Sequence, residues 1–177
     1  MIGYYLTHPQ VEIDAATPVP LWSLSAKGRE RLAGIRTAAW LKTVRRIVSS
    51  EERKAVETAA ILAAGLGIMP ESGSGLGEND RSSTGFLRPD PFEAAANHFF
   101  RAPEASWNGW ERAIDAQGRI VSRVEKILAA HDAATPILFV GHGAVGTLLK
   151  CHIAGRAISR AEDQPAGGGN VFAFGLA

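Results

Sequence analysis

Three short strand-like runs, each followed at once by polar residues, limit most strongly the folds that this chain can adopt. The runs cover residues 2–8, 46–48 and 136–140, and their aromatic and branched side chains suit buried strands. Helical patterns lie between them. Strands that alternate with helices predict a mostly parallel sheet covered on both faces, the arrangement of an α/β protein.

The remaining elements follow from periodicity and from turn residues. We predict helices over residues 25–40, 50–64, 92–100, 106–131 and 144–154. Ser49 and Glu52 have the spacing of a capping box before the second of these helices. We also predict a weak strand at residues 68–69 and a final strand at residues 171–176, at an edge of the sheet.

Length and composition bound the class of protein. A chain of 177 residues is long enough for one domain with a sizeable core, so we expect a single domain over residues 1–177. Residues 79–103 are irregular apart from one short helix, and we interpret them as an insertion over the sheet and the site.

Charge and cysteine content narrow the choice of partners and compartment. A net charge of +1 predicts neither nucleic acid nor a membrane surface as a partner. The single cysteine, Cys151, excludes an internal disulfide and fits a reducing compartment. We see no signal peptide and no apolar run that could span a bilayer, so we expect a cytoplasmic protein. The oligomeric state stays open.

Polar residues at the carboxyl ends of three strands are expected to meet at one edge of the sheet. These residues are Thr7-His8, Ser49-Ser50 and Gly141-His142-Gly143. Two of the three open helices, whose amino termini bind phosphate. A neutral imidazole can attack phosphorus, and a second, cationic imidazole can stabilise the phosphoryl oxygens. Glu78, at the end of a Ser/Gly-rich loop, can protonate a leaving alkoxide.

Five motifs in this order carry a resemblance to a known family. They are Leu6-Thr7-His8-Pro9, Leu24-Ser25-Ala26-Lys27-Gly28, the helix start from Ser49 to Ala59, Glu78, and Val140-Gly141-His142-Gly143. Together they resemble the histidine phosphatase superfamily, also called the phosphoglycerate mutase-like fold. The resemblance implies a three-layer α/β/α sandwich, with His8 as the phosphate-accepting nucleophile, His142 as the charge-stabilising histidine and Glu78 as the acid. It implies no metal and no cofactor.

The chain departs from the family pattern at three positions. Thr7 stands where the family has an arginine, Pro9 stands where it has a glycine, and Lys54 replaces the arginine of the helix motif. Arg53, Arg81 and Arg88 are candidates to replace the missing charge, the last two from the insertion. We therefore predict that the phosphate or substrate is held by a set of six residues: Thr7, Ser49, Arg53, Lys54, Arg81 and Gly143.

Two functional hypotheses follow from this pattern. In the first, the protein hydrolyses a phosphomonoester through a phosphohistidine on His8. In the second, it is a catalytically weak or inactive relative that binds a phosphorylated ligand or a protein partner, because lysine cannot form the bidentate fork of arginine. The other histidines lack metal-ligand spacing, so we predict no metal site.

Overall fold

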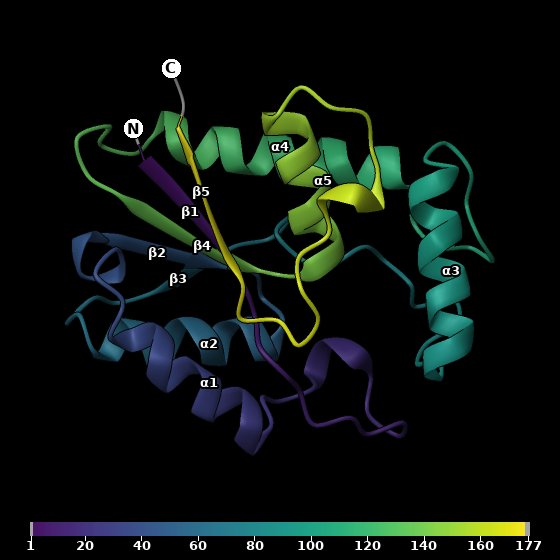
Figure 1. The fold of residues 1–177 in the computed structure, drawn as a ribbon, viewed down its shortest axis with the longest axis horizontal. Coiled ribbons are helices and arrows are strands. Elements are labelled where there is room, and N and C mark those ends of the chain that lie inside the picture. Colours follow the sequence, from purple (N-terminus) through teal and green to yellow (C-terminus); the bar gives the residue numbers. More distant parts are fainter. Residues whose placement is uncertain (1, 176–177) are drawn as a thin grey trace.

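A five-stranded, mostly parallel sheet forms the centre of the computed structural model, which describes residues 2–175 (Figure 1). The strands are β1 (Ile2–Thr7), β2 (Arg46–Ser49), β3 (Glu71–Ser72), β4 (Ile137–Gly141) and β5 (Val171–Gly175). Their order across the sheet is β3-β2-β4-β1-β5, and only β5, at the edge, runs antiparallel to its neighbour. The predictions of a mostly parallel sheet and of an edge position for the last strand are confirmed.

Helices cover both faces of this sheet. In Figure 1, α1 (Ala26–Arg36) and α2 (Arg53–Ala64) lie on one side, whereas α4 (Ala113–Ala129) and α5 (Gly143–Ile153) lie on the other. The remaining helix, α3 (Pro89–Arg101), lies beyond one end of the sheet. Three short 3₁₀ turns complete the described elements: Val19–Leu21, Leu41–Thr43 and Arg160–Glu162. This is the predicted three-layer α/β/α sandwich.

The central strand β4 divides the core into two halves. All five of its residues are buried, as expected for a parallel strand with helices on both faces. Because successive side chains point to opposite faces, Phe139 packs in the cluster under α4 and α5, whereas Leu138 and Val140 pack in the cluster under α1 and α2. None of the helices between residues 2 and 175 has the length and apolar character of a bilayer-spanning segment.

Two helix starts differ from the sequence prediction. The helix predicted over residues 106–131 begins only at Ala113, because Asn108 (φ 46°) and Gly109 (φ 84°) adopt left-handed backbone angles that no α-helix contains. The helix predicted from residue 50 begins at Arg53. The predicted capping box is wrong: the Ser49 hydroxyl donates to the Ser50 carbonyl, and the Glu52 N–H donates to the Ser50 hydroxyl.

Smaller differences concern the ends of other elements. The first helix stops at Arg36 instead of near residue 40. The weak strand predicted at residues 68–69 forms instead at Glu71–Ser72, where it pairs with β2. The final strand is described to Gly175, and its predicted last residue, Leu176, lies outside the described residues.

The buried Tyr5 ring requires glycine at two nearby positions, Gly141 and Gly146, and the second of these gives a stability prediction. A Cβ atom at Gly146, in α5, would lie 2.6 Å from Tyr5 Cε1, so Gly146→Ala should destabilise the fold by about 1–3 kcal/mol. A Cβ atom at Gly118, in α4, would meet no neighbouring group within 4 Å, so Gly118→Ala should stabilise the fold by about 0.5–1 kcal/mol. Urea denaturation of both variants measures these changes, and equal effects would contradict the packing argument.

Candidate active site

The parallel pairing of β1 with β4 brings the two predicted histidines together. Thr7 is in register with Gly141, so the residues that directly follow the two strands, His8 and His142, lie at the same edge of the sheet. The backbone N–H of His8 donates to the Gly141 carbonyl at 2.9 Å. The two imidazole rings then meet edge to face, with their centroids 5.2 Å apart.

The His8 ring presents one free nitrogen. Its Nδ1 lies 2.8 Å from the Pro9 carbonyl oxygen, and since a carbonyl only accepts hydrogen bonds, Nδ1 must carry the proton. The lone pair is therefore on Nε2. Pro9 lacks the N–H of a glycine but keeps this carbonyl. Burial lowers the pKa of His8 to about 4, against an opposing effect of the Pro9 hydrogen bond, so the imidazole is neutral near pH 7.

His142 lies wholly inside the protein, immediately before α5. Its Nε2 is 2.6 Å from the Ser50 hydroxyl and 3.4 Å from Glu52 Oε1. Burial, followed by the nearby His8 and Lys54, lowers the pKa of His142 well below its usual range. The ring is thus neutral near pH 7. The cationic form that we predict from the sequence therefore requires a further anion beside the ring, in addition to the Glu52 carboxylate, to favour protonation.

The Glu78 carboxylate caps the amino terminus of α5. Its Oε2 accepts from the Ala144 N–H at 3.1 Å, and its Oε1 accepts from the Val145 N–H at 3.0 Å. A helix amino terminus attracts anions, and here a side chain of the protein takes that place. The carboxylate faces a cavity with a volume of about 460 Å³ that His8 also lines.

Three of the residues predicted to hold phosphate line this same cavity: Thr7, Arg81 and Gly143. Thr7 is buried, and its hydroxyl accepts from the Asn170 N–H at 3.1 Å. The Arg81 guanidinium stacks over the Phe92 ring, 5.0 Å from its centroid. Arg81 is therefore the predicted cation that the fold brings to the cavity beside His8.

The other three predicted phosphate residues do not line the cavity. Ser49 is buried with its hydroxyl on a backbone carbonyl, and Arg53 is directed outward, 60% exposed and paired with Glu57 at 3.1 Å. A lysine on a helix usually extends into solvent, but Lys54 is only 3% exposed. Its Nζ donates to the Val19 carbonyl at 2.9 Å and to Glu52 Oε2 at 2.5 Å.

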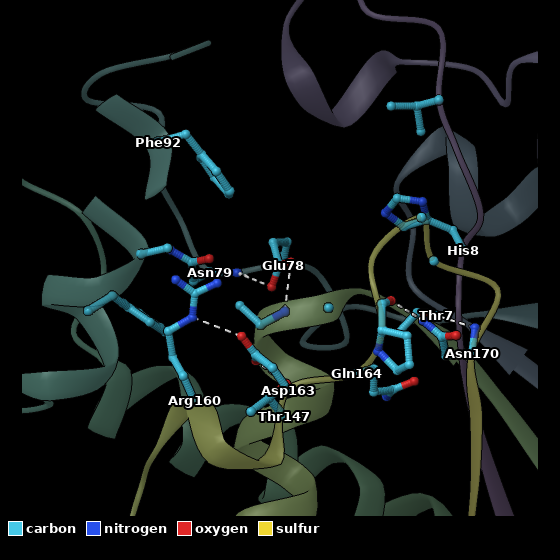
Figure 2. A pocket seen from close by; sticks show the side chains of 18 of the residues that line it. Thr7, His8, Glu78, Asn79, Phe92, Thr147, Arg160, Asp163, Gln164 and Asn170 are labelled. Atoms are coloured by element: carbon cyan, nitrogen blue, oxygen red, sulfur yellow. Dashed lines mark hydrogen bonds and ion pairs between the residues drawn. The ribbon is translucent and has the colours of Figure 1, made fainter. Parts of the chain in front are cut away.

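The rest of the cavity combines an aromatic wall with polar groups. Figure 2 shows His8 on one side and Phe92, Asn79 and Arg160 on the other, with Glu78 between them in this view. Arg160 is paired with Glu93 and Asp163, both at 2.9 Å. Phe99, Phe100 and Trp110 also line the cavity.

Sequence reasoning missed several of these groups. We considered Glu52 only as half of a capping box. Its position two residues before Lys54 is the local sequence signal for the ion pair that the two side chains form. Asn79 directly follows Glu78, but no pattern distinguishes it from other loop residues. Arg160 lies in a segment without any motif.

Within residues 2–175, no group of three or more His, Cys, Asp and Glu side chains is arranged to hold a metal ion.

The lowered pKa of His8 makes stability depend on pH. The unfolded chain, with a His8 pKa near 6.5, binds more protons than the folded chain between about pH 6.5 and pH 4, so acid favours unfolding there. The free energy of unfolding should fall over this range by at most about 3 kcal/mol on account of His8. Urea denaturation at several pH values should show a shallower fall in His8→Gln, and identical pH profiles would refute this assignment.

Comparisons with known proteins place the chain in a family. A model of the histidine phosphatase superfamily (branch 1) matches residues 15–171, so the match begins after Thr7-His8-Pro9. Comparison with curated protein sequences gives no match. Among solved structures, YhfR from Bacillus stearothermophilus is similar, with a TM-score of 0.81 and 23% identity over 99% of this chain and 91% of its own.

Two further structures have the same fold. A mycobacterial glucosyl-3-phosphoglycerate phosphatase gives a TM-score of 0.80 at 19% identity, over 97% of this chain and 88% of its own. The α-ribazole phosphatase of Shigella flexneri gives a TM-score of 0.73 at 16% identity, over 100% of this chain and 91% of its own. With a family model that matches most of its length, the chain belongs to branch 1 of the histidine phosphatase superfamily.

Proposed function

We propose that this protein hydrolyses small phosphomonoesters through a covalent phosphohistidine on His8. The observation that carries the proposal is the state of the His8 ring. Its Nδ1–H is held by the Pro9 carbonyl, which leaves a neutral imidazole with the Nε2 lone pair beside a cavity large enough for a substrate. Membership of the superfamily, and the phosphatase names of two structural relatives, support this assignment.

The reaction then has two steps. The His8 Nε2 lone pair forms a bond to phosphorus as the bond between phosphorus and the ester oxygen breaks. Glu78, which carries a proton in the substrate complex, gives that proton to the leaving alkoxide and becomes a carboxylate. Water next attacks the phosphohistidine with Glu78 taking up its proton, which releases inorganic phosphate and restores the His8 lone pair. We assign His142, Thr7, Arg81 and Gly143 to the phosphoryl oxygens. Ser49 and Arg53 are not part of this assignment.

The leaving group would occupy the cavity beyond the phosphoryl group. Phe92 and Trp110 supply an apolar wall there, and the Arg160 charge is already neutralised by Glu93 and Asp163. These contacts favour an uncharged alcohol with an apolar face.

The whole chain would act as one unit, in which residues 79–103 form an insertion that supplies Asn79, Arg81 and Phe92 to the site.

A second candidate function rests on the scarcity of available positive charge. Among the described residues that line the cavity, Arg81 is the one cation without an ion pair, and Lys54 is held by Glu52. An arginine can contribute about 10³–10⁵ to the rate of phosphoryl transfer. A chain with one such group instead of two could bind a phosphorylated ligand and turn it over slowly or not at all.

Replacement of His8, compared with replacement of a second histidine as a control, tests whether His8 is the nucleophile. His8→Ala should lower kcat/KM by at least about 10³-fold on any phosphomonoester that the wild type hydrolyses, and it should abolish an acid-labile phosphoenzyme. His152→Ala is the matched control, because His152 is 50% exposed and pairs only loosely with Glu125. A folded wild type without activity on a broad panel of phosphomonoesters would favour the binding function.

The role of Arg81 gives a separate prediction. Arg81→Ala should lower kcat/KM by about 10²–10³-fold, because it removes the one unpaired cation among the described residues of the cavity. Arg81→Lys should restore only part of the loss, since lysine keeps the charge but not the planar fork. Steady-state kinetics on the best substrate of the panel measures both. Full activity in Arg81→Ala would assign the phosphoryl charge to other residues.

A further inference from the structure

Glu52 holds two of the groups that surround the nucleophile. Its side chain is only 14% exposed, and its two carboxylate oxygens have different partners. Oε2 accepts from Lys54 Nζ at 2.5 Å, whereas Oε1 lies 3.4 Å from His142 Nε2 and accepts from the Glu78 N–H at 2.8 Å. The carboxylate thus spans the space between a buried ammonium and a buried imidazole.

Lys54 has little freedom to serve any other anion. It is almost completely buried, and its second partner is the Val19 carbonyl at 2.9 Å. Its charge nevertheless acts on both histidines, because it lowers the pKa of His8 and that of His142. Lys54 therefore adds positive charge near both histidines, and its ion pair with Glu52 neutralises that charge.

The charges around the two histidines cancel. Before a substrate binds, the Glu52 and Glu78 carboxylates bring two negative charges, Lys54 and Arg81 bring two positive charges, and both imidazoles are neutral near pH 7. A phosphomonoester carries about two negative charges at this pH. It would enter a site with no net positive charge to balance it, and it would compete with a carboxylate for the same donors.

We propose that Glu52 is a specificity-determining residue, an internal anion that competes with the phosphoryl group for Lys54 and His142. It lowers the affinity of the site for doubly charged phosphoryl groups and so favours phosphoryl groups that carry a single negative charge. This inference rests on the proposed function, since it places the phosphoryl group at His8. If Glu52 instead only braces Lys54 and His142, its loss would weaken phosphate binding or leave it unchanged.

Binding of two oxyanions by isothermal titration calorimetry tests this inference without any need for turnover. At about pH 8, inorganic phosphate is mainly a dianion and dimethyl phosphate is a monoanion. Glu52→Gln keeps the size of the side chain but removes its charge, and it should tighten phosphate binding by at least about tenfold. Its effect on dimethyl phosphate should be several-fold smaller, so the selectivity for the monoanion should fall.

Two further variants isolate the cause. Glu51→Gln removes the same charge from the neighbouring exposed residue and should leave both affinities unchanged within about twofold. The double variant Glu52→Gln with Lys54→Met should lose the gain in phosphate affinity, because the freed ammonium is then absent. A gain that persists in the double variant would overturn the role of Lys54 and with it the inference.

The remaining outcomes also decide the question. Phosphate affinity that is equal or lower in folded Glu52→Gln overturns the inference and leaves the proposed function intact. Phosphate binding by neither protein overturns both. If Glu52→Gln does not fold, as judged by its thermal melt, Glu52→Asp replaces it, since a side chain about 1.5 Å shorter moves the carboxylate away from Lys54 and should also raise phosphate affinity.

Discussion

The parallel pairing of β1 with β4 is the constraint on which the rest of the site depends. The register of Thr7 with Gly141 places His8 beside His142, and the Tyr5 hydroxyl strengthens this junction. That hydroxyl accepts from the His142 N–H at 3.0 Å and donates to the His142 carbonyl at 3.2 Å. Because both of these hydrogen bonds go to the backbone of His142, they hold the turn from β4 into α5.

The need to pair buried charges explains why this site has so little free positive charge. An ammonium as buried as Lys54 is destabilising without a partner, and Glu52 supplies that partner within the same turn of chain. The same reasoning applies to Arg160 with Glu93 and Asp163. Ion pairs that stabilise the fold therefore reduce the positive charge that is available to a ligand.

Sequence patterns predicted the parts of the structure that depend on local chemistry. Residues 136–140 are apolar throughout because β4 is buried on both faces, and Gly141, the residue before His142, allows the close approach of Tyr5. Helix starts were less accurate. Asn108 and Gly109 break the helix predicted over residues 106–131, and the apolar spacing of Trp107 and Trp110 gave no sign of that break, since both tryptophans still pack against the core.

The sequence by itself determined the strand–helix alternation, the histidines at the strand ends and the family that the chain resembles. Only the tertiary structure decided which polar residues meet: Glu52 reaches Lys54 and His142, Arg81 lies over Phe92, and Arg53 is directed to solvent. The reason is physical. Periodicity reports which face of an element is buried, whereas partners for buried charges come from segments far apart in the chain, and their geometry exists only once the sheet and its helices are packed.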